Sequence, residues 1–198
     1  LAALGNQVQF QCLVDKDLDH WFGPLQTVGR LRWSMYCSME LHFLTPEIVR
    51  DILLTTGRAK IKNLGDFLGS LVAVLRELYI LRLADRQTSL ALRWVALRRY
   101  LSRDGDYIRF ARDAYAIAVL TSNQCAARRP DFDNACGVWT RIVAGDFRDH
   151  VRGHDFVALL AWAMQVFDGH REFATEQAIE RLLVLLARNV PTLMLELQ

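Results

Sequence analysis

Arginine and aromatic side chains alternate between positions 93 and 112, the stretch of the sequence with the clearest potential for binding chemistry. Guanidinium groups bind phosphates and carboxylates through paired N–H donors, and aromatic rings stack on unpaired nucleobases. Trp94, Tyr100 and Phe110 supply further rings within this stretch. The side chains that we expect to contact a partner are Arg93, Arg98, Arg99, Arg103, Tyr107, Arg109 and Arg112.

Three interpretations of this segment stay open at the level of the sequence. It is an arginine-rich interface for another protein, a surface that binds RNA, or the solvated face of two amphipathic helices. Asp104, Asp106 and Asp113 favour the last interpretation, because they neutralise part of the positive charge. Arg128 and Arg129 would extend the surface if it binds a partner.

Two histidines, His150 and His154, are four positions apart, which is the spacing of a metal site on one helix face. Gly153 separates them, and residues 148–153 have the composition of a connection between helices. We therefore expect surface or capping roles for both and no metal. A cleft that gathered them with His170 would instead indicate a helical enzyme with dispersed site residues.

Alternating acids near the start of the chain, Asp15, Asp17 and Asp19, are a second candidate for metal binding. A calcium loop needs a central glycine and a terminal glutamate, and neither is present here. An acidic helix start or a solvated turn is the expected structure.

Local catalytic and cofactor motifs are absent. The chain has no GxxxxGK[ST] or GxGxxG phosphate loop, no GxSxG nucleophile elbow and no HExxH zinc motif. These motifs are short and contiguous, so their absence predicts a protein that is not an enzyme and carries no cofactor.

Composition bounds the class of protein. Of 198 residues, 52% are hydrophobic and only four are proline, which excludes a mainly disordered chain. The net charge of +2 is too small to indicate a nucleic-acid-binding protein by itself. Lysine occurs at three positions, so 21 of the 24 basic residues are arginine. Either a GC-rich coding sequence or selection for bidentate contacts explains this bias.

The cysteines and apolar runs predict an intracellular protein, in the cytoplasm or in an organelle matrix such as that of the mitochondrion. Four cysteines occur without a CxxC pair, which is typical of reduced and mostly buried thiols. The apolar run at 157–167 has eleven residues and is too short to cross a bilayer, which takes roughly 20. The chain begins at Leu1, as expected for a fragment or for a processed form such as an organelle protein without its targeting segment.

Helical periodicity with short connections dominates the rest of the chain. The clearest pattern runs over 60–84, where leucines form an apolar stripe that contains Gly65 and Gly69. Because glycine destabilises a helix interior by about 1 kcal/mol, we expect a close backbone approach at these two positions. The other helices are expected at 24–43, 45–55, 88–101, 106–122, 131–144, 155–168 and 175–189, after a short apolar start at 7–14.

The segment Arg58–Leu71, RAKIKNLGDFLGSL, resembles a helix of the middle domain of translation initiation factor 4G and its relatives, which include the large scaffold subunit of the cytoplasmic deadenylase. Those domains carry a similar Lys-x-Leu-Gly-x-x-x-Gly-x-Leu pattern. The resemblance implies a stack of helical hairpins of the HEAT type that recruits a DEAD-box RNA helicase and sometimes RNA. It covers about fifteen residues, and the helicase-docking positions do not map onto this chain.

Together these patterns predict an all-α fold, with about eight helices in antiparallel hairpins that form a compact bundle or a short HEAT- or TPR-like solenoid. One helical domain is expected over 1–198. The predicted function is that of a non-enzymatic scaffold or accessory subunit, with an RNA-binding helical-repeat module as the alternative. The apolar tail at 190–198 is expected to pack on the last helix or to contact a protein partner.

Overall fold

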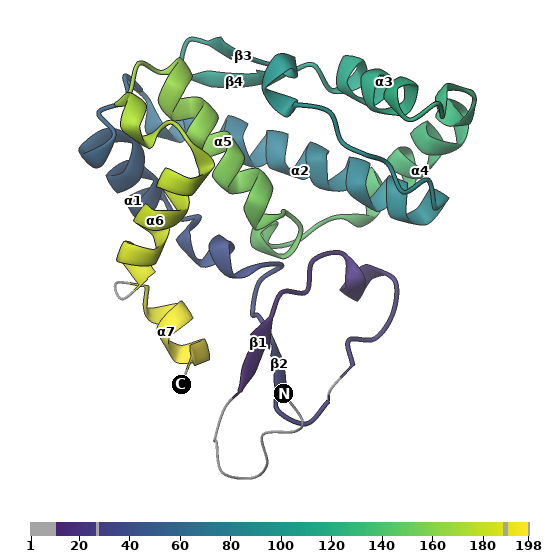
Figure 1. Cartoon of the computed structure of the whole chain (residues 1–198), viewed down its shortest axis with the longest axis horizontal. Helices are drawn as coiled ribbons and strands as arrows, with labels where there is room; N and C mark the ends of the chain where they lie inside the picture. Colours follow the sequence, from purple (N-terminus) through teal and green to yellow (C-terminus); the bar gives the residue numbers. More distant parts are fainter. Residues whose placement is uncertain (1–10, 27, 188–189, 198) are drawn as a thin grey trace.

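The structure is a computed structural model that describes residues 11–26, 28–187 and 190–197, and most of this part of the chain is helical (Figure 1). One long helix runs through the centre, and the N-terminal strands extend below the helical body. The α-helices are α1 (Pro46–Arg50), α2 (Leu64–Thr88), α3 (Arg112–Ser122), α4 (Arg129–Ile142), α5 (Gly153–Val166), α6 (Glu176–Leu186) and α7 (Pro191–Leu197). The strands are β1 (Cys12–Val14), β2 (Leu31–Trp33), β3 (Leu101–Asp104) and β4 (Tyr107–Phe110).

Helix α2 forms the core of the fold, as the apolar stripe predicts. Its first turn is capped by Asn63, whose side-chain oxygen accepts hydrogen bonds from the N–H groups of Gly65 and Asp66 at 3.0 and 3.3 Å. In the second half, the consecutive residues 78–81 are all buried, so the helix is enclosed on every side. Helices α4 and α5 pack against it, and β4 covers its first half.

The expected backbone approach at Gly65 and Gly69 is wrong. A Cβ atom added at Gly69 would have open space around it, and one at Gly65 would meet only the capping side chain. Close approaches occur instead at Gly57 and Gly169, where an added Cβ would collide with the side chain of Met164. A Cβ atom added at Gly153, the first residue of α5, would likewise collide with the side chains of Glu40 and Ser38, so the tight packing is at both ends of α5 and not along α2.

The helix predicted over 88–101 is absent, because this stretch forms a loop and the 3₁₀ helix η5 (Leu97–Tyr100), and an antiparallel hairpin replaces the start of the helix predicted over 106–122. Strands β3 and β4 pair from Leu101 with Phe110 to Asp104 with Tyr107, around a two-residue turn. Gly105 has a φ of +62°, a conformation that glycine adopts without a steric penalty. The two turn residues are Gly105 and Asp106, and glycine at the first turn position between short β-compatible runs is a hairpin signal, so this element was detectable in the sequence.

The helix predicted over 24–43 is also absent. Strand β2 pairs in parallel with β1, and a short 3₁₀ helix, η3 (Met39–Phe43), follows it. The chain is thus mostly helical but not all-α, because it contains two small sheets. Of the apolar start at 7–14, residues 7–10 lie outside the described residues.

The remaining helices begin within a few residues of the positions that the sequence predicts. Thr45 accepts a hydrogen bond from the N–H of Ile48 at the start of α1, which continues as a π-helical turn over Asp51–Thr56. Thr175 likewise caps α6 by accepting from the N–H of Ala178. Helices α4 and α5 match the ranges expected at 131–144 and 155–168.

Candidate functional site

The aromatic side chains of the 93–112 segment gather around Tyr115, which is only 2% exposed. The ring centroids of Trp94, Tyr100 and Phe110 lie 6.1, 5.2 and 5.5 Å from the Tyr115 ring. Burial raises the pKa of the Tyr115 hydroxyl to about 12. Three of the four aromatic rings in this segment are therefore half-buried and packed on Tyr115.

Arg103 of β3 has a structural role. Its guanidinium lies 4.4 Å from the centre of the Phe167 ring. It donates hydrogen bonds to the backbone carbonyls of Val166 at 3.2 Å and Lys60 at 3.3 Å. This side chain joins the hairpin to the end of α5 and to the segment before α2.

Arg109 and Tyr107 lie on the exposed side of β4. Arg109 forms an ion pair with Asp104 across the hairpin at 2.8 Å, and its guanidinium lies 5.6 Å from the centre of the Tyr107 ring. A hydrogen bond with Asp66 raises the pKa of the Tyr107 hydroxyl. Tyr107 is 41% exposed, so it is the most exposed of the four rings in this segment.

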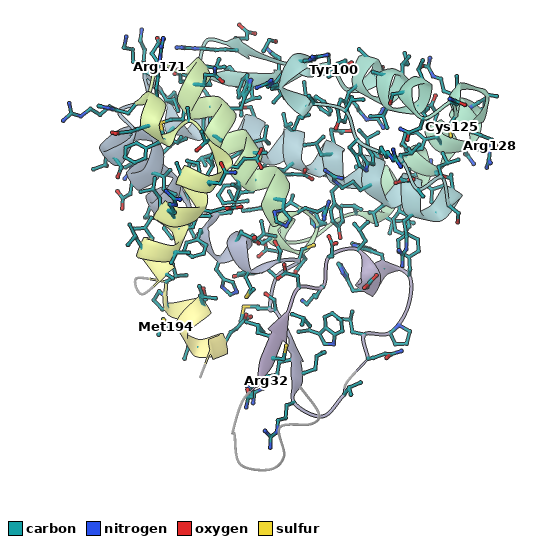
Figure 2. All side chains as sticks on the ribbon, in the orientation of Figure 1. Arg32, Tyr100, Cys125, Arg128, Arg171 and Met194 are labelled. Atoms are coloured by element: carbon teal, nitrogen blue, oxygen red, sulfur yellow. The ribbon has the colours of Figure 1, made fainter. Side chains whose placement is uncertain are left out.

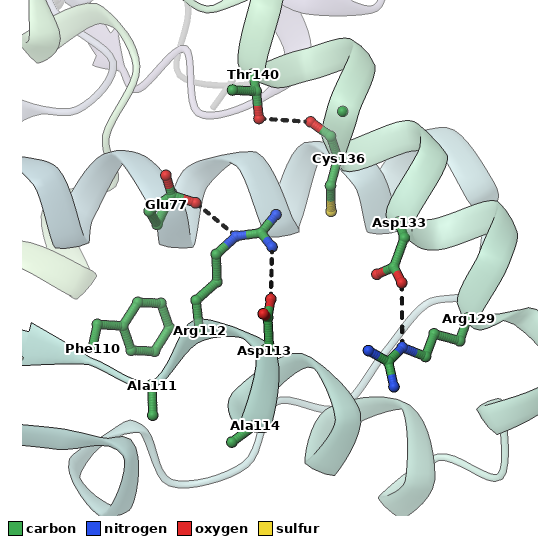
Figure 3. Close-up of a pocket in the computed structure, with 11 residues that line it drawn as sticks. Glu77, Phe110, Ala111, Arg112, Asp113, Ala114, Arg129, Asp133, Cys136 and Thr140 are labelled. Carbon is green, nitrogen blue, oxygen red and sulfur yellow. Dashed lines mark hydrogen bonds and ion pairs between the residues drawn. The ribbon is translucent and has the colours of Figure 1, made fainter.

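Arg112 lines an open groove of about 880 Å³ between α2, α3 and α4 (Figure 3). Its guanidinium contacts Glu77 at 2.7 Å and Asp113 at 3.2 Å. On the other side of the groove, Arg129 pairs with Asp133 at 3.2 Å. The two arginines thus face each other with their charges already compensated by acids.

The thiol of Cys136 points into the same groove (Figure 3). Burial raises its pKa to about 11, although the charge of Arg112 acts in the opposite direction. A thiol with this pKa stays protonated at neutral pH, and the protonated form is a poor nucleophile. The groove therefore lacks an activated cysteine.

Arg93, Arg98 and Arg99 are exposed between α2 and the hairpin. The backbone of Arg93 exchanges two hydrogen bonds with the side chain of Asn123, at 2.9 and 2.8 Å. No acid among the described residues pairs with the guanidinium groups of these three arginines. The predicted contact residues are therefore split between internal ion pairs and this short exposed segment. Arg128, which we expected to extend it, lies beside Cys125 (Figure 2) and pairs with Asp131 at 2.8 Å.

The histidines do not form a cluster. His150 is buried, His154 is exposed, and His170 lies 3.8 Å from Glu172. Within the described ranges, no three His, Cys, Asp or Glu side chains are close enough to hold a metal ion.

The C-terminal helices present apolar side chains on two sides, a feature that the sequence pattern of a single tail did not reveal. Ile179 and Leu183 of α6 are buried in the core. The adjacent Val184 and Leu185 are 73% and 74% exposed. On α7, Leu195 is 69% exposed. We refer to Val184, Leu185, Met194 and Leu195 as the C-terminal apolar surface.

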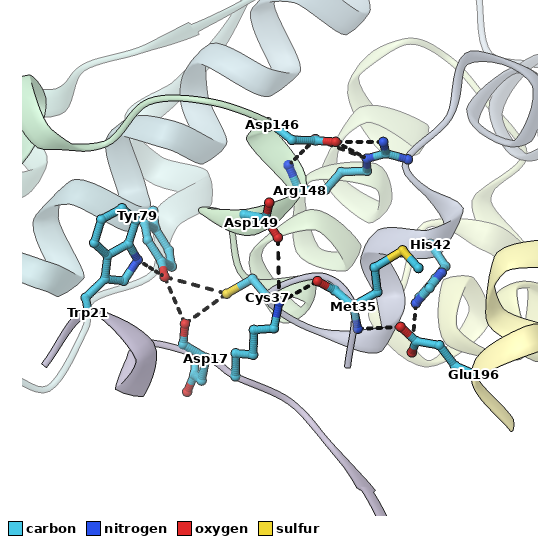
Figure 4. A network of polar contacts seen from close by, with 11 residues as sticks. Asp17, Trp21, Met35, Cys37, His42, Tyr79, Asp146, Arg148, Asp149 and Glu196 are labelled. Atoms are coloured by element: carbon cyan, nitrogen blue, oxygen red, sulfur yellow. Dashed lines mark hydrogen bonds and ion pairs between the residues drawn. The ribbon is translucent and has the colours of Figure 1, made fainter. Parts of the chain in front are cut away.

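Helix α7 is held to η3 by the buried His42 (Figure 4). One ring nitrogen lies 2.9 Å from the hydroxyl of Thr192, and the other lies 3.2 Å from the carboxylate of Glu196. Glu196 also accepts a hydrogen bond from the backbone N–H of Met35. The tail expected at 190–198 therefore packs on the protein through one side, while Met194 lies at its outer side (Figure 2).

No protein-family model matches the chain, and no curated protein matches it either. Among the described residues, no helix is both long and apolar enough to cross a membrane. The function is therefore inferred from the geometry of the surfaces described above.

Proposed function

We propose that this chain is a non-catalytic helical module that binds another protein, as a scaffold or accessory subunit of a larger assembly. The single observation that carries the proposal is the exposure of Val184 and Leu185 on a helix whose opposite side is already buried. Large apolar side chains clustered at a surface mark interaction sites more often than isolated ones do.

The fixed position of α7 supports this assignment. His42 and Glu196 anchor the helix, so Met194 and Leu195 are presented on a docked element. Apolar groups on an ordered helix lose little conformational entropy on binding, which favours association. We assign the partner contact to the C-terminal apolar surface, of which the exposed Arg98 and Arg99 are not part.

The RNA-binding alternative receives less support from the geometry. Stacking on unpaired bases needs accessible rings, and Trp94, Tyr100 and Phe110 pack on Tyr115. The three exposed arginines could contact phosphates only. The relationship to the initiation-factor domain and the arrangement of the helices as a repeat stay predictions.

Photo-crosslinking of the full chain in its own cells tests the proposal. A crosslinking amino acid at position 185 is expected to give one discrete product that contains a second protein. The matched control carries the same amino acid at position 99. The double variant Val184→Ser with Leu185→Ser, probed from position 195, is expected to lose the product while keeping its circular dichroism spectrum.

Absence of any product from positions 185 and 195 would contradict the proposal. A product that contains only two copies of this chain would also contradict it, because it would identify a self-association surface. Equal yields of the same product at positions 185 and 99 would reject the assignment to the C-terminal apolar surface.

A further inference from the structure

A cleft of about 500 Å³ lies where the C-terminal end of α2 meets the N-terminal end of α5. We call it the arginine cleft, because three arginines line it together with acids and a tryptophan. Its polar lining residues are Asp17, Arg82, Asp85, Arg86, Ser89 and Arg152, and Trp94 adds its ring. None of these residues belongs to the surface proposed above, so the cleft is an independent feature.

Arg82 is the most buried of the three arginines, with 15% of its side chain exposed. Its Nε and Nη2 atoms donate to the two carboxylate oxygens of Asp155 at 2.8 and 2.6 Å. Burial opposes the charge of Arg82, but Asp155 outweighs it and raises the pKa. The guanidinium also lies 4.7 Å from the centre of the Trp94 ring. It is therefore charged and fixed in orientation.

The three arginines carry more N–H donors than their partners use. A guanidinium has five N–H groups. Arg82 uses two nitrogens for Asp155, and its Nη1 has no hydrogen-bond partner among the described residues. Arg152 likewise contacts Asp17 through Nε at 2.8 Å and Nη2 at 3.5 Å. Nη1 of both arginines is left for a ligand.

Arg86 adds donors on a more open side of the cleft. Its only ion pair in the described structure is a 3.5 Å contact with Asp19, and 60% of its side chain is exposed. A contact of this length on the surface contributes little stability, so a ligand can compete for the guanidinium. The hydroxyl of Ser89 is a further donor at the same edge.

The backbone around the cleft is held in unfavourable conformations. Asp17, Ser89 and Ala91 have φ values of 45°, 53° and 51°, in the left-handed region. Non-glycine residues in this region are strained, and such strain concentrates at binding sites. Ser89 ends α2, and the side chain of Asp85 accepts a hydrogen bond from the N–H of Leu92, which fixes the following loop.

The backbone of Asp17 is held in place by the hydrogen-bond network in Figure 4. Its backbone carbonyl accepts hydrogen bonds from the hydroxyl of Tyr79 at 2.8 Å and from the thiol of Cys37 at 2.9 Å. With its backbone fixed in this way, Asp17 places its carboxylate within hydrogen-bond distance of Arg152. Arg82 and Arg152 are thus held in place before any ligand arrives, which reduces the entropy cost of binding.

We propose that the arginine cleft binds a small molecule through an oxyanion group, a carboxylate or a phosphate, held by Arg82, Arg86 and Arg152. Charge-assisted hydrogen bonds from guanidinium groups are the strongest contacts available to such groups. Each of the three arginines already pairs with one acid, Asp155, Asp19 or Asp17, so a ligand would share the guanidinium groups with these carboxylates, while Asp85 accepts from backbone N–H groups. The volume of the cleft matches a small-molecule site and is too small for a folded partner.

Calorimetric titration of the full chain with inorganic phosphate and, separately, with succinate tests the proposal. We expect saturable binding of at least one of them at about 10 mM or below, weakened by added salt. The double variant Arg86→Gln with Arg152→Gln is expected to weaken that binding by at least about tenfold. The matched control Arg98→Gln with Arg99→Gln removes two exposed arginines elsewhere and should leave it unchanged.

Each outcome has a defined meaning. Binding of phosphate alone assigns a phosphate ester, and binding of succinate alone assigns a carboxylate ligand. No binding of either probe, or equal binding by the cleft variant and the control, overturns the proposal. If circular dichroism shows that the double variant is unfolded, the single variant Arg86→Gln decides, since the weak ion pair of Arg86 makes it dispensable for folding.

Discussion

The hydroxyl of Tyr79 donates a 2.8 Å hydrogen bond to the backbone carbonyl of Asp17, which joins the middle of α2 to the N-terminal segment. The same hydroxyl accepts a hydrogen bond from the indole N–H of Trp21 at 2.9 Å, and the thiol of Cys37 lies 3.6 Å away. Burial raises the pKa of Tyr79, so the hydroxyl stays protonated and keeps donating. This contact connects the packed core to the arginine cleft.

Replacing Tyr79 with phenylalanine is expected to lower the free energy of unfolding by about 1–3 kcal/mol. The ring would still fill its volume, but the Asp17 carbonyl and the Trp21 indole would lose a buried partner. Urea denaturation measures the change. Tyr107→Phe is the control, because that ring is on the surface and should change stability by less than about 0.5 kcal/mol. Equal effects of the two changes would contradict the role of the network.

Alanine at Gly69 is expected to stabilise the protein by up to about 1 kcal/mol. The added methyl group would meet open space, and alanine is the better helix former. Alanine at Gly57 is expected to destabilise it, because the methyl would meet Met164 and the carbonyl of Ile52. Thermal unfolding of both variants gives the comparison. A loss of stability in the Gly69 variant would instead support the close backbone approach that the sequence predicts at this position.

Acidification is expected to weaken the fold through its histidines. Burial lowers the pKa of His20, His42 and His150 below their ordinary value of 6.5. The unfolded chain therefore binds protons more readily than the folded one, and the free energy of unfolding falls as the pH drops below about 6.5. Burial raises the pKa of Asp15 and Asp85 instead, which favours the folded state at lower pH.

The histidine effect is measured by urea denaturation at about pH 7.5 and about pH 5.5. Both values lie above the pH range in which aspartates usually titrate. The variant His150→Gln should show a smaller difference between the two pH values than the unmodified protein. His154→Gln is the control, since this histidine is exposed. If the difference in stability between the two pH values were the same in His150→Gln as in the unmodified protein, His150 would be excluded as a contributor.

Replacing Arg82 with methionine is expected to cost about 3–5 kcal/mol of stability. It would leave the carboxylate of Asp155 buried at 7% exposure without its partner. The surface ion pair of Arg109 with Asp104 offers the comparison, and Arg109→Gln should cost less than about 1 kcal/mol. Chemical denaturation of the two variants distinguishes them. If the two variants lost similar amounts of stability, the ion pair between Arg82 and Asp155 would contribute no more than a surface pair.

Alkylation with iodoacetamide is expected to modify Cys12 long before Cys37 and Cys136. Cys12 is exposed, whereas the other two thiols are buried and burial raises their pKa to about 12 and about 11. Reaction rate follows the accessible thiolate, so the buried thiols should react only after unfolding in urea. Peptide mass spectrometry resolves the sites. Rapid native labelling of Cys136 would indicate that the groove beside Arg112 activates it.

The central helix and the starts of α1 and α6 were predictable because their signals are local. The apolar stripe of α2 has the period of a helix, and Thr45 and Thr175 are capping residues at the expected positions. The hairpin was missed because its turn, at Gly105, was interpreted as a break between two helices. An arginine-rich stretch with aromatic residues carries no period strong enough to separate a short strand from a helix.

The arginine cleft could not be predicted from the sequence. Arg82 and Asp155 are 73 positions apart, and Asp17 and Arg152 are 135 positions apart. No local motif links residues at such separations, because tertiary packing alone brings them together. The division of the 93–112 residues between internal contacts and the surface has a related cause. Its rings follow the burial pattern around Tyr115, a position beyond the segment itself.

Arg103 has a consequence for how the hairpin can be used in experiments. Because its guanidinium is held by the carbonyls of Lys60 and Val166, the turn end of the hairpin moves together with the helical body. The exposed turn at Gly105 is consequently fixed in orientation relative to the helices. A spin label or fluorophore attached beside it would report the orientation of the whole protein within an assembly, with little contribution from local motion.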